Sequence, residues 1–205
     1  NFSNSPPAPT TPVNVSRWFA EKLDDYGYQQ VDEVYYPPTA NGVVPITNSI
    51  ENGVGIITYR GWGNAHGWNY PYFHEDDIAN LNNGWKLPVM TSIVCNTGDF
   101  GNINVDPCFG EKWLRAGTTP TSPKGGVAFV GPSDLHTSTR LNNTIFAGFW
   151  TAVMDEGVRE FGVAVLAGKM ELYRNFPNNQ GPDDLVNFYF HVYNVLADPS
   201  LMMWM

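Results

Sequence analysis

The chain has 205 residues, of which 42% are hydrophobic and 14% aromatic, a composition typical of one folded domain with a sizeable core. Its formal net charge of −9 argues against nucleic acid or an anionic membrane surface as the main partner. No apolar run reaches the length of a transmembrane helix, and the chain opens without a basic and apolar leader. We therefore expect no nucleic-acid partner and no membrane insertion.

The beginning of the chain is rich in proline. Residues 1–12 are expected to form an arm or linker, followed by a single domain over residues 13–205 that is part of a longer chain. This domain is expected to open with an amphipathic helix over Val15–Leu23, for which Asn14 is the N-cap. Alternating side chains then predict a strand over Gln30–Tyr36.

Further along the chain, short apolar runs alternate with segments of helical spacing. The runs predict strands at Val54–Tyr59, Val89–Val94 and Gly126–Val130. Helices are predicted at Val44–Glu51, Asp76–Leu81, Cys108–Ala116, Leu141–Met154, Gly162–Leu172 and Leu185–Leu196, and an edge strand at Leu201–Trp204. This alternation predicts an α/β fold, with a mostly parallel sheet and helices on both faces.

Each predicted core strand runs into a loop of polar residues and glycines. In a parallel sheet these loops, Tyr59–Gly67, Cys95–Asp99 and Gly131–His136, would share one rim, where such folds place their ligands and reactive groups. Cys95 lies at the start of the second loop. A free cysteine is often only a small core residue, but the convergence of three loops favours a reactive thiol at this position.

A cysteine nucleophile needs a base and backbone N–H donors for the oxyanion. Four histidines are available. His66 lies in a glycine-rich turn and is followed by Gly67, so it is either the base or part of a structural turn. His136 follows the third strand. His74 is expected to be a surface or capping residue, and His191, inside the last helix, is expected to have no catalytic role.

The two cysteines are expected to be free thiols. Cys108 is predicted at a helix start, with Pro107 as the first helical residue. The helix dipole can lower the pKa of a thiol there, but the flanking residues indicate a packing role. No cluster of Cys and His has zinc spacing, and no nucleotide-binding motif is present. We therefore predict no metal site from the sequence pattern itself.

Four residues of the rim loops are candidates for substrate binding: Trp62, Trp68, Asp134 and His136. The two tryptophans are suited to form an aromatic wall for a peptide. Asp134, like Asp99, either attracts a basic substrate side chain, binds calcium or is a solvated loop residue. The sequence leaves these alternatives open.

Several segments resemble the catalytic domain of gingipain-type cysteine peptidases over residues 43–205. They are Asn52–Gly63, Cys95–Phe100, Pro107-Cys-Phe-Gly-Glu111, Gly126–Gly131 and His191–Asp198. The resemblance implies a caspase-like three-layer sandwich and an endopeptidase that acts on peptides or proteins with Cys95 as nucleophile. It also implies secretion or a cell-surface location in Bacteroidota-like bacteria, no required cofactor, and bound structural calcium. Other domains of the same longer chain are expected partners.

One difference from the family pattern affects the chemistry. Trp62 stands where the family places its catalytic histidine. In one interpretation, His66, a few residues further on, serves as the base for Cys95, and the N–H of Gly63 or Gly67 and that of Cys95 are the oxyanion donors. In the other, the chain is an inactive pseudo-peptidase that serves as a binding or assembly module. The retained thiol and the glycine-rich loop favour the first interpretation.

Overall fold

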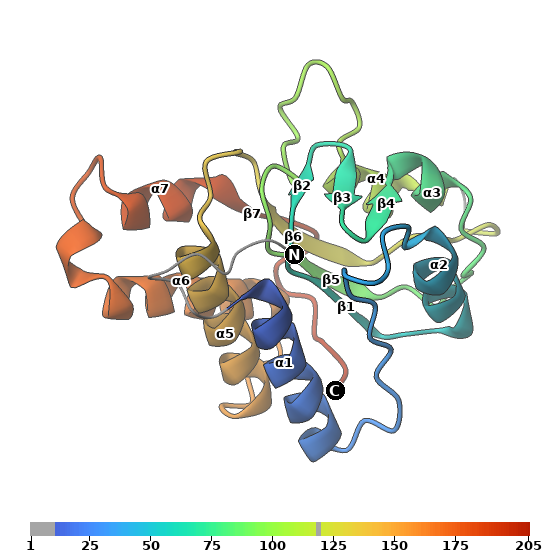
Figure 1. The fold of residues 1–205 in the computed structure, drawn as a ribbon, viewed down its shortest axis with the longest axis horizontal. Coiled ribbons are helices and arrows are strands. Elements are labelled where there is room, and N and C mark those ends of the chain that lie inside the picture. The colour runs from blue at the N-terminus through green and yellow to red at the C-terminus, as the bar shows by residue number, and fades with distance from the viewer. Residues whose placement is uncertain (1–10, 118–119) are drawn as a thin grey trace.

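The protein is described by a computed structural model over residues 11–117 and 120–205. Its centre is a four-stranded sheet with the strand order β1-β5-β6-β7 (Figure 1). The strands are β1 (Ile56–Tyr59), β5 (Val89–Ser92), β6 (Ala128–Pro132) and β7 (Tyr193–Leu196). β1, β5 and β6 are parallel, whereas β7 runs antiparallel to β6. The prediction of a mostly parallel sheet is confirmed.

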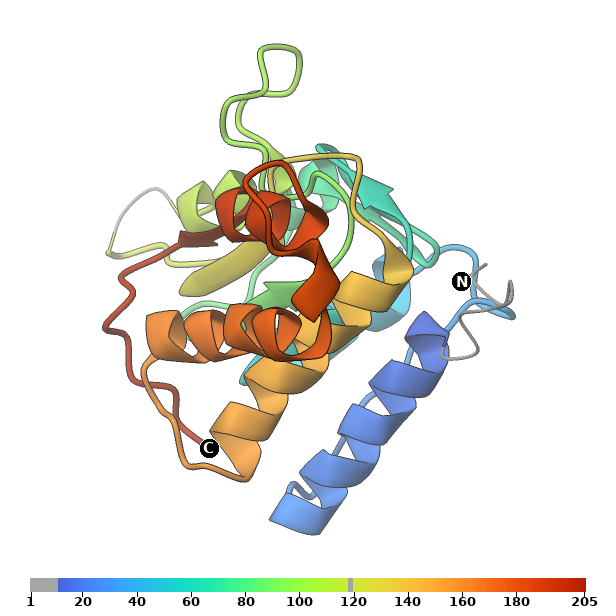
Figure 2. The ribbon, with the colours of Figure 1, turned by 90° about the vertical axis from the view of Figure 1, so that its left-hand side faces the viewer.

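Helices cover both faces of this sheet and complete three layers (Figures 1 and 2). One layer holds α1 (Pro12–Tyr26), α5 (Thr139–Met154), α6 (Phe161–Asn175), a 3-10 turn (Pro177–Asn179) and α7 (Leu185–Val192). The other holds α2 (Val43–Asn52), α3 (Glu75–Ala79) and α4 (Phe109–Arg115).

The two faces of the sheet bury separate hydrophobic cores. Along β5 and the residues after it, Val89 and Ile93 join the core under α1, α5, α6 and α7, while Met90 and Val94 join the core under α2, α3 and α4. This alternation follows from the two-residue period of a strand. The predicted α/β sandwich with helices on both faces is confirmed. No helix of the described residues has the length and apolar character to cross a membrane.

A second, smaller sheet follows β1 directly and was not predicted. Its three antiparallel strands are β2 (Gly63–Asn64), β3 (Gly67–Asn69) and β4 (Tyr72–His74). Trp68 and Phe73 bury their rings in the core under α2, α3 and α4. Strands of two or three residues are too short to show an alternating pattern, which explains why the sequence did not indicate them.

The first helix is longer than predicted at both ends. The hydroxyl group of Thr11 accepts a hydrogen bond from the N–H of Asn14 at 3.1 Å, so that Thr11 is the N-cap and Pro12 the first helical residue. Gly27 ends the helix with a φ of +106°, a conformation that favours glycine. The predicted arm therefore loses Thr11 and Pro12 to the domain, and its residues 1–10 lie outside the described part of the chain.

The prediction of a strand over Gln30–Tyr36 is wrong, because this segment is not paired in a sheet of the described residues. The segment joins α1 to α2 and pairs with no strand of the described residues. Residues 31 and 34–36 are half-buried and residues 30, 32 and 33 are exposed, so the burial of the segment does not follow the two-residue period of a strand. The residue pattern alone does not identify the neighbour that a strand needs.

Two predictions near the end of the chain are also corrected. The helix predicted over Leu185–Leu196 ends at Val192, because the next four residues pair with β6 as β7. These residues are rich in strand-forming side chains. The predicted edge strand Leu201–Trp204 forms only an isolated bridge, between Met202 and Glu160.

Candidate active site

Cys95 lies just beyond β5, at the end of the sheet where β1, β5 and β6 reach their carboxyl ends. The chain turns sharply there, and Asn96 has a φ of +58°, which is uncommon for any residue except glycine. Cys95 is a free thiol and only partly buried. Its sulfur atom lies against the hydroxyl and carbonyl groups of Thr137 and not only against aliphatic side chains.

The three predicted rim loops meet around this cysteine. The N–H of Asn96 donates to the carbonyl of Asp134 at 3.0 Å, and the N–H of Gly98 donates to the carbonyl of Pro132 at 2.9 Å. On the other side, Gly63 lies so close to Val94 and Thr97 that a Cβ atom on it would be 3.3 Å from each side chain. The predicted convergence of the loops is confirmed.

A chain of hydrogen bonds leads from the sulfur atom of Cys95 into the core. The hydroxyl group of Thr137 donates to Sγ at 3.2 Å. Thr137 Oγ1 in turn accepts from Asn142 Nδ2 at 3.2 Å, and Asn142 Oδ1 accepts from the buried hydroxyl group of Tyr193 at 2.6 Å. The sulfur thus has an oriented donor that is itself held by α5 and β7.

Arg60, the residue after β1, places a buried positive charge beneath the rim. Only 6% of it is exposed, and no carboxylate of the described residues forms an ion pair with it. Its guanidinium donates to the carbonyls of Ile93 and Thr139 and to Asn143 Oδ1. Burial lowers the pKa of Arg60 to about 10, which leaves it charged at neutral pH, and this charge attracts negative charge at Cys95.

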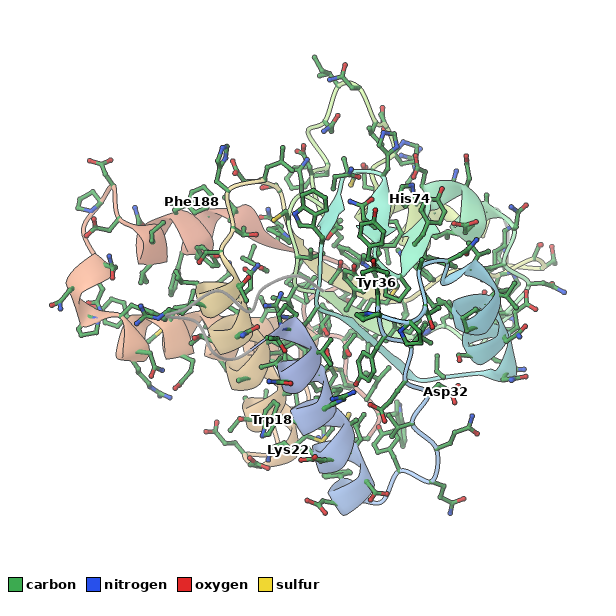
Figure 3. The ribbon with its side chains drawn as sticks, in the orientation of Figure 1. Trp18, Lys22, Asp32, Tyr36, His74 and Phe188 are labelled. Carbon is green, nitrogen blue, oxygen red and sulfur yellow. The ribbon has the colours of Figure 1, made fainter. Side chains whose placement is uncertain are left out.

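His66 lies in the turn between β2 and β3. Its Nδ1 is 2.6 Å from Glu75 Oε1 at the start of α3, so the carboxylate orients the ring. The ring also faces His74 of β4, with 6.2 Å between the centroids; Figure 3 labels this second histidine. No hydrogen bond joins His66 to Cys95 among the described residues. The structure therefore gives His66 a partner but not a contact with the thiol.

The backbone N–H groups of Cys95 and Gly63 are the candidate oxyanion donors in this region. The N–H of Cys95 has no acceptor among the described residues. The N–H of Asn69 bonds to the carbonyl of Trp62, and Gly63 pairs with Trp68 one step further along. Because hydrogen-bonded and open pairs alternate in antiparallel strands, the N–H of Gly63 points away from β3.

Gly67 occupies a different environment from Gly63. It forms the next pair with Asn64, so its N–H faces β2. A Cβ atom on it would lie 2.5 Å from the carbonyl oxygen of Phe73 and 2.8 Å from the ring of Phe109, and its φ is +139°. Of the two predicted glycine donors, Gly63 is the one beside the Cys95 loop, whereas Gly67 is needed for close packing.

The predicted substrate-binding residues fall into two groups. Trp62 is 59% exposed, but Trp68 is only 2% exposed and stacks on Tyr59. The aromatic wall expected from both tryptophans is therefore corrected to Trp62 alone. His136 is exposed and its Nδ1 is 2.8 Å from Asp134 Oδ1. This pair sits on the loop that holds Thr137 against the thiol.

The second cysteine has a structural position, as predicted. Cys108 is fully buried, and its burial raises the pKa of the thiol to about 11. It caps α4 and does not lie within it, and Pro107 precedes the cap. Glu111 completes this cap by accepting the N–H of Cys108 at 3.1 Å. Burial thus outweighs the backbone hydrogen bonds of Glu111 and Gly110, which lower the pKa of this thiol.

The two rim carboxylates, Asp99 and Asp134, accept hydrogen bonds within their own loops. Asp99 Oδ2 accepts from Asn102 Nδ2 at 2.8 Å, and Asp134 Oδ1 accepts from the N–H of His136 at 2.7 Å. No group of three or more His, Cys, Asp or Glu side chains that could hold a metal ion occurs among the described residues. Structural calcium, which the resemblance implies, stays a prediction.

A three-layer α/β domain that presents a hydrogen-bonded thiol at the carboxyl end of its parallel strands is the architecture of caspase-like cysteine peptidases. The model of peptidase family C25 matches residues 4–204, nearly the whole chain. The chain therefore belongs to peptidase family C25.

The relatives that the chain matches are longer than the chain itself. Gingipain R2 and gingipain R1 of Porphyromonas gingivalis are each 31% identical over 113 residues, which are 54% of this chain and 14% and 11% of the relatives. The crystal structure of the Arg-specific cysteine proteinase gingipain R has a TM-score of 0.82 at 20% identity, over 93% of this chain and 42% of that chain. A complex of the pro- and mature domains of the Porphyromonas gingivalis proteinase RgpB has a TM-score of 0.83 at 20% identity, over 98% and 45%. The chain thus spans less than half of each relative.

Three residues of the site were missed by sequence reasoning. Thr137 follows His136 directly, Glu75 follows His74, and Arg60 is the first residue after a predicted strand. Each of the three is a direct neighbour of a histidine or a strand that the sequence analysis had considered. The position of Arg60 directly after a predicted strand was the one available signal, because the partners of Thr137 and Glu75 depend on how the loops fold.

Proposed function

We propose that this chain is the thiol-bearing domain of a secreted cysteine endopeptidase. Cys95 attacks the carbonyl carbon of a peptide bond, and the carbonyl oxygen takes up the negative charge. The observation that carries the proposal is the partly buried residue Cys95, whose sulfur accepts a hydrogen bond from Thr137 beside two N–H groups that have no acceptor among the described residues. Those N–H groups, on Cys95 and Gly63, are suited to hold the oxyanion.

In this proposal His66 takes the thiol proton and passes it to the departing amine. Glu75, at 2.6 Å from Nδ1, fixes the ring and leaves Nε2 for the proton, as the third group of a catalytic triad does. A water molecule then cleaves the thioester and releases the acid. Because catalytic hydrogen bonds are often long or absent without substrate, the missing contact between His66 and Cys95 is compatible with this role.

Substrate contacts are proposed for the exposed ring of Trp62 and for the pair of Asp134 and His136. Trp62 presents a large apolar surface beside Gly63, where a peptide backbone would approach the oxyanion donors. Asp134 and His136 border the opposite side of the Cys95 loop. A peptide bound between Trp62 on one side and Asp134 and His136 on the other would pass over the sulfur atom of Cys95.

The experiment is a panel of fluorogenic peptides assayed with the full-length protein. Replacing Cys95 by Ala is expected to abolish cleavage. His66→Ala is expected to lower kcat by about 10²–10⁴-fold, the usual value of general base catalysis, and Glu75→Gln by less. His191→Ala is the matched control, since His191 is exposed on α7 and should leave the rate unchanged.

The outcomes separate the alternatives. If His66→Ala is as active as His191→Ala, His66 is not the base, although the protein remains a peptidase. If no peptide is cleaved in a manner that depends on Cys95, and a thiol-directed inhibitor does not label it, the enzyme proposal fails. The chain would then be an inactive module that binds peptides or assembles a complex.

A further inference from the structure

A large apolar side chain is exposed on, or directly after, each of the three loops that meet at Cys95. Trp62 on the loop after β1 is 59% exposed, Phe100 directly after the Cys95 loop is 57% exposed, and Leu135 on the loop after β6 is 55% exposed. Single exposed apolar residues are normal on a protein surface, whereas several around one point indicate a binding site. These three side chains are called the apolar rim below.

Two members of the apolar rim are attached to the Cys95 loop itself or packed against it. Trp62 precedes Gly63, where a Cβ atom would lie 3.3 Å from the side chain of Thr97, two residues beyond Cys95. Phe100 follows further along the same loop. Both residues are therefore held close to the thiol by the backbone that carries them.

Leu135, the third member, is held beside the thiol by the loop after β6. The carbonyl of its neighbour Asp134 accepts the N–H of Asn96 at 3.0 Å. On its other side, the hydroxyl group of Thr137 donates to the sulfur of Cys95 at 3.2 Å. Leu135 thus lies between two residues that bond to the Cys95 turn, and the apolar rim borders the thiol from all three loops.

The carboxylates of the same loops already have partners within the protein. Asp99 Oδ2 accepts from Asn102 Nδ2 at 2.8 Å. Asp134 Oδ1 accepts the N–H of His136 at 2.7 Å and lies 2.8 Å from the ring Nδ1 of the same residue. A basic substrate side chain would have to compete with these partners for both carboxylates.

Arg60 makes a charged substrate side chain still less favourable. It is buried beneath the rim, and no carboxylate of the described residues forms an ion pair with it, so its charge repels a second cation at the sulfur. Its own N–H groups donate to the carbonyls of Ile93 and Thr139 and to Asn143 Oδ1, and not towards a substrate carboxylate. A charged side chain that leaves water without a partner is costly, whereas an apolar one is stabilised by burial.

We propose that the substrate carries a large apolar side chain, such as that of Phe or Leu, next to the bond that Cys95 attacks, and that the apolar rim binds it. The inference rests on the proposed endopeptidase function for the place where the peptide lies, and it adds the substrate class. Because the three side chains come from three different loops, they surround the substrate side chain and do not contact it from one direction only.

The test measures binding to the full-length protein with Cys95→Ala, which removes the nucleophile. A set of fluorescent peptides shares one sequence except for a central residue, which is Phe, Leu, Ala, Arg or Glu. By fluorescence polarisation, the Phe and Leu peptides are expected to bind at least about tenfold more tightly than the other three, because burial of one large apolar side chain has an effect of this size. Equal or tighter binding of the Ala, Arg or Glu peptide overturns the proposal, as does the absence of binding at millimolar concentration.

The apolar rim is then tested one residue at a time in the same Cys95→Ala protein. The variants are Trp62→Ala, Phe100→Ala and Leu135→Ala. Each is expected to weaken the binding of the Phe peptide by roughly three- to tenfold and to leave that of the Ala peptide unchanged. The matched controls are Trp85→Ala and Leu166→Ala, which remove exposed side chains from the segment before β5 and from α6 and should change neither. A preference for Phe that survives all three rim variants overturns the proposal.

Cleavage of the same peptides by the protein with Cys95 intact is measured separately. If the Phe peptide binds but no peptide is cleaved, the endopeptidase function fails and the substrate class stands. If cleavage depends on Cys95 but occurs next to Arg, or without preference, the endopeptidase function stands and the apolar substrate class fails.

Discussion

The sulfur atom of Cys95 accepts a hydrogen bond from the hydroxyl group of Thr137 and also lies 3.8 Å from the carbonyl oxygen of the same residue. Thr137→Val keeps the shape of the side chain and removes the O–H that donates to Sγ. A hydrogen bond to a charged group is typically worth about 1.5–3 kcal/mol, so the variant should react with iodoacetamide at pH 7 roughly tenfold more slowly, because the thiolate loses its donor.

The matched control is Thr144→Val. Thr144 lies on α5 and its hydroxyl group donates to the carbonyl of Arg140, not to the thiol. Its replacement should leave the alkylation rate unchanged. Equal rates for Thr137→Val and the unmodified protein would show that the bond to the sulfur has no effect on its reactivity.

The buried thiol of Cys108 predicts a pH dependence of stability. Burial raises its pKa from 9.0 to about 11, so the unfolded chain loses this proton at a lower pH than the folded one. The stabilising effect is therefore fully present below pH 9 and disappears as the pH rises towards 11. The free energy of unfolding of the protein, minus that of Cys108→Ala, should fall by up to about 1.4 kcal/mol per pH unit in this window.

Denaturant titrations at pH 8, 9 and 10 measure this difference, and the subtraction removes the effects of other groups. Iodoacetamide should label Cys95 but not Cys108 in the folded protein at pH 8, since Cys108 is fully buried. A difference that does not change between pH 8 and 10 would contradict the raised pKa.

At the scale of elements, the Cys95 loop is held against the loop after β6 by a close contact of two glycines. A Cβ atom on Gly98 would lie 2.6 Å from the carbonyl oxygen of Gly131. Gly98→Ala should force the two loops apart and destabilise the fold by about 1–3 kcal/mol, the usual cost of overpacking.

Gly101→Ala is the control for this prediction. A Cβ atom there would meet only Asp99 Oδ1, at 3.9 Å, so the free energy of unfolding should change little. Chemical denaturation of the two variants measures the difference. Equal stabilities would mean that the loops separate at no cost and that the rim is not rigid.

The sequence predicts well those elements whose side chains have a strong period. The three parallel strands and the helices on both faces follow from such patterns, and the meeting of three loops at Cys95 follows from parallel strand direction. The patterns fail where a partner decides the structure. Residues 193–196 continue an apparent helix but form β7 because β6 offers an edge, and Gln30–Tyr36 alternates like a strand without one.

The candidate site shows the same division. Cys95 and the rim loops were predictable, because their positions follow from the order of the strands. The burial of Trp68, the bond from Thr137 to the thiol and the pairing of His66 with Glu75 were not, because each depends on a contact between loops. Sequence spacing contains no information on which loop side chains meet.

On the scale of the whole molecule, the two hydrophobic cores differ in the helices that they join. One is built mainly by α1, α5, α6 and α7, and the other by α2, α3, α4 and the small sheet. β5 and β6 contribute to both. The candidate site lies at the end of these shared strands, so its geometry depends on the packing of both layers.

The hydrogen bonds from Cys95 through Thr137 and Asn142 to Tyr193 connect positions almost a hundred residues apart. During synthesis on the ribosome, the cysteine emerges long before the tyrosine. A nascent chain that has not yet produced Tyr193 therefore carries a thiol without its supporting network. The hydrogen-bonded environment of this thiol can therefore form only after the C-terminal part of the domain has been made.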